Sequence, residues 1–121
     1  MQFKDMVVEK EYEGAPLLLR IMAEEFEKFS SFNFGKEPVV TRVLEAIPGD
    51  AGVHEDYRAL DIRQEHDGVF MYTPDEQDAI LTYFNKRYKR NDGKLSIICH
   101  SFNGSPFHFH LQIAVFTKAY Q

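Results

Sequence analysis

The segment 37–46, EPVVTRVLEA, alternates with a period of two, as a β-strand does when the two faces of its sheet meet different surroundings. On one face we expect Val39, Thr41 and Val43, and on the other Val40, Arg42 and Leu44. The segment 58–63, RALDIR, is a second and shorter strand, in which Ala59 and Asp61 share a face. Its apolar residues on the opposite face are Leu60 and Ile62. Asp61 is therefore expected on the face that does not carry the core.

Two further strands are predicted in the last third of the chain, at 94–100 and 107–116. The residues that join them, SFNGSP, have the composition of a turn. In the second strand the apolar residues are Phe107, Phe109, Leu111 and Ile113, and those that alternate with them are His108, His110 and Gln112. One face of this strand is apolar, and the other carries two imidazoles.

Helical periodicity appears in two other segments. Between residues 16 and 29 the apolar residues recur at steps of three and four, and they are Leu18, Met22, Phe26 and Phe29. A second helix is predicted to begin at TPDE, 73–76, where the threonine caps the helix and the glutamate reaches back to complete a capping box. The turn-forming NDG, 91–93, ends it. Together these elements predict an α+β fold, in which about two helices pack on an antiparallel sheet.

A chain of 121 residues predicts a single domain, 1–121, because half of it would be too short to bury a sufficient core. Its formal net charge of −5 argues against nucleic acid as a partner, since phosphate contacts need a basic stripe. The only dense basic run, 85–90, falls where the second helix should end, and cations there complement the helix dipole.

No stretch approaches the roughly 20 apolar residues of a membrane-spanning helix, and the acidic N-terminal segment does not resemble a secretory signal. We therefore expect no membrane insertion and a protein that is cytoplasmic at synthesis, wherever it acts. The single cysteine, Cys99, excludes an internal disulfide and leaves histidines and carboxylates as the expected ligands of any metal ion.

His54 and Asp61 stand seven residues apart, and a histidine of the last strand could complete a metal site with them. Two imidazoles and one carboxylate leave an open position on a zinc ion, which can then polarise a carbonyl and activate a water. Ala59, on the face of Asp61, would leave room for the ion. Spacing alone leaves the alternative open that His54 is a solvated loop residue and that the strand histidines are exposed positions of an edge strand.

On these residues the chain resembles the zinc D-alanyl-D-alanine carboxypeptidases and dipeptidases, the murein endopeptidases and the hedgehog signalling domain. Those proteins share the pattern S-x-H-x-x-G-x-A-x-D, followed late in the chain by a strand with H-x-H. This chain matches the first pattern at His54, Ala59 and Asp61, and the second at 108–110. The likeness covers residues 37–115 and implies a fold like that of the hedgehog domain and the D-Ala-D-Ala peptidases.

The resemblance implies zinc as the cofactor, with His54, Asp61 and His110 as its ligands. It makes His108 the catalytic histidine that faces the reacting water. It also makes Arg42 a clamp for a substrate carboxylate, which a guanidinium fork suits. On the strand pattern alone, Arg42 could equally be a surface residue.

Three positions depart from the family pattern. Gly52 stands where the family has serine and Tyr57 where it has glycine, so the turn between the ligands must take another shape. Many members also use a glutamate shortly before the last histidine as general base, and after Asp92 this chain has no acidic residue. Some murein endopeptidases use histidines instead. His108 could do so here, and His100 either joins it or is a plain strand-end residue.

By this resemblance the expected function is that of a zinc metallopeptidase, a hydrolase that cleaves D-amino-acid-containing peptides of peptidoglycan. A small domain of this kind without a signal looks like a phage or prophage lysis protein, which reaches the cell wall by another export route. The alternative is a zinc-binding structural or ligand-binding module of the same fold that has lost hydrolysis. A non-haem iron protein uses the same donor set, but its usual ligand spacing is shorter.

Overall fold

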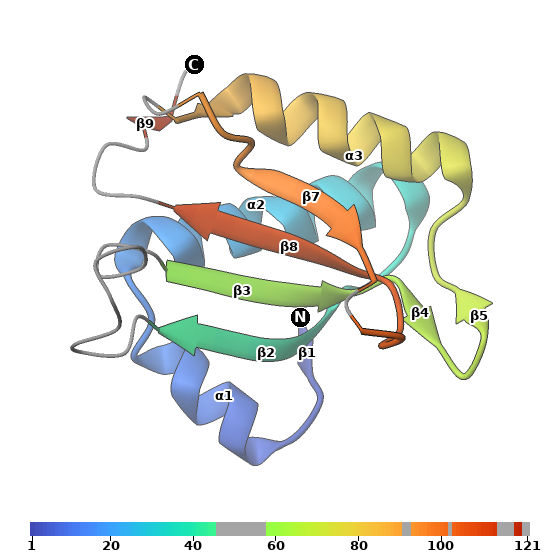
Figure 1. Cartoon of the computed structure of the whole chain (residues 1–121), viewed down its shortest axis with the longest axis horizontal. Coiled ribbons are helices and arrows are strands. Elements are labelled where there is room, and N and C mark those ends of the chain that lie inside the picture. Colours follow the sequence, from blue (N-terminus) through green and yellow to red (C-terminus); the bar gives the residue numbers. More distant parts are fainter. Residues whose placement is uncertain (46–57, 91–92, 102, 114–117, 120–121) are drawn as a thin grey trace.

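The computed structural model describes residues 1–45, 58–90, 93–101, 103–113 and 118–119, and its fold is of the α+β class that the sequence predicts. The main sheet has five strands in the order β1-β2-β3-β8-β7 (Figure 1). Their bounds are β1 Gln2–Phe3, β2 Val39–Glu45, β3 Arg58–Arg63, β7 Ile97–His100 and β8 His108–Ile113. β1 pairs parallel with β2, and the other pairs of this sheet are antiparallel. Two small pairs join β4 (Glu65–His66) to β5 (Val69–Phe70), and β6 (Tyr88–Lys89) to β9 (Lys118–Ala119).

The described residues form three helices beside the sheet: α1 (Met6–Glu13), α2 (Leu17–Phe34) and α3 (Pro74–Arg87). α2 crosses behind the sheet, and α3 runs along the side that ends with β7 (Figure 1). Apolar residues from all three helices join those of the sheet in one core, among them Tyr12, Leu19, Phe26, Phe84, Leu60, Ile62, Phe109 and Leu111. The predicted apolar faces of β3 and β8 are therefore the faces that carry the core.

α3 begins where the sequence predicts. Oγ1 of Thr73 accepts a hydrogen bond from the backbone N of Glu76 at 3.2 Å, and Oε1 of Glu76 accepts one from the backbone N of Thr73 at 2.8 Å. The helix ends at Arg87, and the stop predicted at 91–93 lies partly outside the described residues. No helix in the described part of the chain has both the length and the apolar character needed to cross a membrane.

α1 is a helix that the sequence analysis does not predict. Its N-cap is Asp5, whose Oδ1 accepts a hydrogen bond from the backbone N of Val8 at 2.9 Å. Only Val8 and Tyr12 of this helix are buried, while Met6 and Val7 are exposed. A buried stripe of two residues is too short to stand out as helical periodicity.

A β-bulge in β2 changes which residues share a face of the sheet. Val40 lies opposite Ile62 and Arg42 lies opposite Asp61, so β2 has one residue more than β3 in this interval. The faces predicted from strict alternation are therefore wrong here, because Val40 and Val43 both join the core. Arg42 is carried to the face of Asp61 instead of sharing a face with Val40.

Candidate metal site

Strand register brings four polar side chains to the face of the sheet that lies away from the core. Asp61 of β3 lies opposite His110 of β8, and His108 of β8 lies opposite His100 of β7. Residues directly opposite on paired strands project from the same face. Because Phe109, between the two histidines of β8, is in the core, both histidines point away from it.

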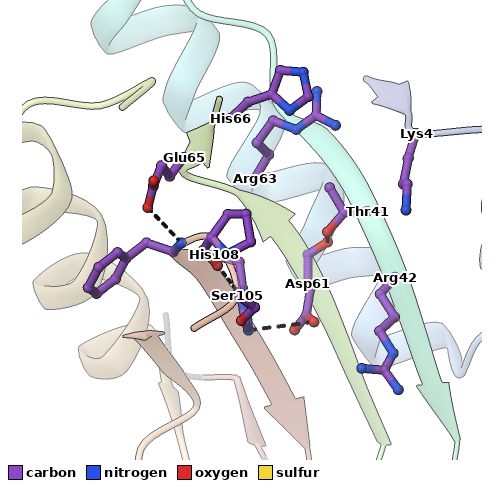
Figure 2. Close-up of a pocket in the computed structure, with 11 residues that line it drawn as sticks. Lys4, Thr41, Arg42, Asp61, Arg63, Glu65, His66, Ser105 and His108 are labelled. Atoms are coloured by element: carbon purple, nitrogen blue, oxygen red, sulfur yellow. Dashed lines mark hydrogen bonds and ion pairs between the residues drawn. The ribbon is translucent and has the colours of Figure 1, made fainter. Parts of the chain in front are cut away.

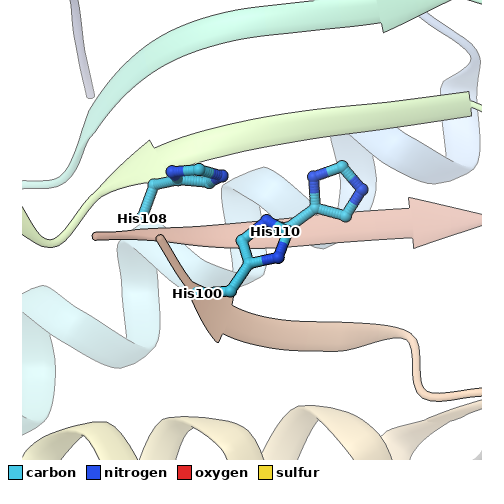
Figure 3. Close-up of side chains that lie close together, drawn as sticks. All are labelled: His100, His108 and His110. Carbon is cyan, nitrogen blue, oxygen red and sulfur yellow. The ribbon is translucent and has the colours of Figure 1, made fainter. Parts of the chain in front are cut away.

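The three histidines lie close enough to bind one metal ion. Their ring centroids are 4.6 Å apart for His100 and His108, 5.3 Å for His100 and His110, and 6.4 Å for His108 and His110 (Figure 3). One nitrogen from each ring lies within 4.8 Å of the others. Nitrogens that share a tetrahedral zinc ion are about 3.3 Å apart, so the separations here approach those of a bound site.

Asp61 joins this cluster through both oxygens of its carboxylate. Oδ1 lies 2.7 Å from Nδ1 of His110, at hydrogen-bond distance, and Oδ2 lies 3.6 Å from Nε2 of His108. Asp61 is only 6% exposed and His110 only 8%. A carboxylate removed from water in this way needs partners that compensate its charge, and the two imidazoles are placed to do so.

His108 is held by its other ring nitrogen. Nδ1 lies 3.1 Å from the backbone oxygen of Pro106, which can only accept a hydrogen bond, so Nδ1 carries the proton. In the neutral ring the lone pair is then on Nε2, the nitrogen that faces Oδ2 of Asp61. Two acceptors that face each other are reconciled by a proton, by a metal ion or by a water that donates to both. Metal-ligating histidines commonly donate their second N–H to a carbonyl or a carboxylate, as His108 does here.

His100 is suited to be a neutral member of the cluster. Burial lowers the pKa of its imidazole, and the neighbouring His108 and His110 lower it further, against the opposing effect of Asp61. A histidine must be neutral to bind a metal ion. His100 therefore has the protonation state of a ligand or of a proton acceptor at neutral pH.

A pocket of about 400 Å³ opens beside the cluster on the same face of the sheet (Figure 2). Asp61 and His108 line it on one side, and Arg42 lines it from β2. The side chain of Arg42 is exposed, and Figure 2 shows it beside Asp61. The bulge in β2 is what brings Arg42 to this pocket, because it sets Arg42 opposite Asp61.

The structure thus brings together four of the five residues predicted for the site: Arg42, Asp61, His108 and His110. The fifth, His54, lies outside the described residues, as do Gly52 and Tyr57. That His54 reaches the cluster therefore stays a prediction.

His100 is the member of the cluster whose place the sequence did not decide. Its position depends on the pairing of β7 with β8, which sets His100 opposite His108. A signal for this was present, since SFNGSP joins two predicted strands and a hairpin turn would bring their adjoining ends together. The exact register across such a loop does not follow from composition, because one residue of slip reverses the faces.

Comparison of the chain with protein-family models, with curated proteins and with solved structures finds no match. The geometry of the cluster and of its pocket is therefore the basis on which a function can be argued.

Proposed function

We propose that this face of the sheet binds zinc and that the protein is a zinc-dependent hydrolase of D-amino-acid-containing peptides, of the kind found in peptidoglycan. The observation that carries the proposal is the contact of Asp61 with two imidazoles. Oδ1 is hydrogen-bonded to His110, and Oδ2 lies 3.6 Å from the Nε2 of His108. Asp61 is thus placed either to bind an ion together with His110 or to orient His110 towards one.

Two ligand sets are compatible with this geometry. In the first, which the family resemblance implies, Asp61 and His110 bind zinc together with His54. In the second, the three histidines of the cluster bind it, and Asp61 orients His110 through Nδ1. The first set assigns His100 and His108 to proton transfer, and the second uses them as ligands.

A zinc ion at this place would polarise the scissile carbonyl and lower the pKa of a water molecule, so that the water loses a proton and can attack the carbonyl. In the first ligand set, His108 would accept the proton of that water and return it to the leaving amine. His100, whose ring lies 4.6 Å from that of His108, would share this task in place of the absent glutamate. Arg42, on the same pocket, would hold a carboxylate of the substrate.

The experiment is to incubate the zinc-loaded protein with peptidoglycan fragments and with D-Ala-D-Ala peptides, and to follow released D-amino acids or cleaved peptides by mass spectrometry. We expect hydrolysis by the wild type. We expect loss of hydrolysis in His108→Ala, with zinc retained in the first ligand set and lost in the second, and loss of zinc in His110→Ala in both. His66→Ala is the matched control for zinc content, because His66 is 60% exposed and lies outside the cluster of three histidines. It should keep its zinc.

Zinc content then separates the two ligand sets. Loss of zinc in His54→Ala with retention in His100→Ala supports the first set, and the reverse result supports the second. Wild-type zinc content in His54→Ala, His100→Ala and His110→Ala alike would overturn the proposed site.

A second candidate function is a zinc-binding module without hydrolysis. The absence of any Asp or Glu after Asp92 favours it, because the usual general base of the resembling peptidases is then missing. Stoichiometric zinc with a raised melting temperature, and no cleavage of any peptide, would support this candidate and contradict the peptidase.

A further inference from the structure

The pocket beside the histidine cluster contains three cationic side chains from three neighbouring segments, Lys4, Arg42 and Arg63. We infer that these three residues, the cation trio, bind an acidic ligand with two separated carboxylates, so that the substrate class of the site is an acidic peptide. The inference rests on the proposed function only in one respect: it takes the side of the pocket with the histidines as the place where the substrate reacts.

The backbone directs all three cations to the face of the histidines. Phe3 packs against the core, so the next residue, Lys4, projects to the other face, and its backbone N bonds the oxygen of Val40 at 2.8 Å. Arg42 lies opposite Asp61. Arg63 lies opposite His108. The cations therefore occupy the β1–β3 half of this face and the imidazoles its β7–β8 half, with Asp61 between them.

The cation trio has no anionic partner among the residues that the structure describes, where none of the three forms an ion pair. The two carboxylates that line the same pocket have other contacts. Asp61 contacts the two histidines of β8, and Glu65 accepts a hydrogen bond from the backbone N of Phe107 at 3.1 Å. Three cations that form no ion pair with the described residues create a local field in this pocket that attracts anions, even though the chain has a net charge of −5.

The arrangement of the cation trio provides for two anionic groups rather than one. Figure 2 shows the side chain of Arg63, on β3, apart from that of Arg42, which lies on β2 beside Asp61. One guanidinium is enough to bind one carboxylate in a bidentate manner. A single carboxylate at Arg42 would leave Arg63 without a partner. A volume of about 400 Å³ accommodates a small ligand that spans both.

The test is an NMR titration of the full chain, freed of metal on a chelating resin so that carboxylates cannot bind to an ion. The three probes are glutarate with two carboxylates, butyrate with one, and inorganic phosphate as a compact anion. We expect glutarate to shift the amide signals of Arg42 and Arg63, and to bind about fivefold more tightly than butyrate, the gain that one exposed ion pair gives.

Arg63→Gln should lower the affinity for glutarate about fivefold, to that of butyrate, and leave the affinity for butyrate unchanged. Lys86→Gln, which removes an exposed cation of α3, should change neither. Equal affinities of the wild type for glutarate and butyrate would overturn the inference. So would phosphate binding as tight as that of glutarate, because it indicates one compact anion site.

These outcomes are independent of the proposed function. The titration involves neither zinc nor hydrolysis. A protein that binds glutarate more tightly than butyrate but cleaves no peptide would therefore support the inferred acidic ligand and contradict the proposed peptidase activity. A protein that cleaves peptides but binds glutarate and butyrate equally would support the proposed activity and contradict the inferred acidic ligand.

Discussion

Nδ1 of His110 lies 2.7 Å from Oδ1 of Asp61, although the two residues stand 49 positions apart in the sequence. The antiparallel pairing of β3 with β8 sets them opposite each other, and both are nearly buried. In either proposed ligand set this carboxylate would contribute to the metal site, as a ligand or as the group that orients His110. The site should therefore depend on Asp61 even though it offers three histidines as well.

The first prediction is that Asp61→Asn weakens zinc binding by at least about 10- to 100-fold, the usual cost of losing a carboxylate that orients a metal-binding histidine. Asparagine keeps the size of the side chain but removes the negative charge that lies beside the two imidazoles. The measurement is a zinc titration in competition with a chromophoric chelator.

Asp67→Asn is the matched control for this substitution. Asp67 is 89% exposed and lies in the turn between β4 and β5, so its removal should leave zinc affinity unchanged. An Asp61→Asn protein that binds zinc as tightly as Asp67→Asn would show that the carboxylate does not serve the site.

Local signals predicted much of the fold. The strand 58–63 coincides with β3, and the capping box at 73–76 marks the start of α3, because each depends on residues close together in the sequence. The alternation of His108 and His110 with Phe109 also placed both imidazoles on the face away from the core. These features were set by local periodicity and by capping chemistry.

Features that depend on strand pairing could not be predicted in the same way. The bulge in β2 is a mismatch between two strands, so it cannot be seen in the alternation of 37–46 alone, and it places Arg42 and Val40 on different faces. The place of His100 likewise depends on the register of β7 against β8. The histidine pattern indicated a metal site, and the register determines which side chains reach it.

The second prediction concerns the core that supports the site from behind. Phe26 of α2 is fully buried, and its ring centroid lies 5.3 Å from that of Phe109, the residue between the two histidines of β8. Phe26→Ala should lower the free energy of unfolding by about 3–5 kcal/mol, because it leaves a cavity. Phe32→Ala on the same helix should change it by less than about 0.5 kcal/mol, since Phe32 is 90% exposed. Urea unfolding followed by circular dichroism measures both, and equal losses would contradict the position of α2.

The third prediction concerns the end of α2. Gly35 caps this helix with a φ of 64°, a left-handed conformation that a Cβ disfavours, although no atom beyond the adjoining residues lies within 4 Å of where that Cβ would be. Gly35→Ala should therefore cost about 1 kcal/mol through the backbone alone. Gly14→Ala, at the end of α1 where φ is −92°, should cost less than about 0.5 kcal/mol. Thermal unfolding of the two variants under the same conditions gives the comparison, and a smaller loss at Gly35 than at Gly14 would refute it.

The last prediction is a pH dependence of stability that comes from Glu25 of α2. Its Oε1 accepts hydrogen bonds from Tyr83 at 2.8 Å and from Nε of Arg87 at 2.7 Å, and its Oε2 accepts one from Tyr88. Partial burial would raise the pKa of Glu25, but these hydrogen bonds and the charge of Arg87 outweigh it and lower the pKa below the ordinary value of 4.5. The carboxylate form is therefore favoured by folding.

A pKa that is lower in the folded than in the unfolded chain stabilises the fold above the unfolded pKa, and this stabilisation is lost as the pH falls through the folded value. Glu25→Gln should accordingly reduce the free energy of unfolding by about 1–2 kcal/mol at neutral pH. The difference from the wild type should shrink as the pH falls below the unfolded pKa of 4.5, because the unfolded chain then binds a proton at Glu25 more readily than the native chain does. Urea unfolding at a series of pH values measures this difference, with Glu24→Gln as the control because Glu24 is exposed on the same helix. A difference that stays constant from neutral to acidic pH would mean that the lost stability comes from packing and not from the charge of Glu25.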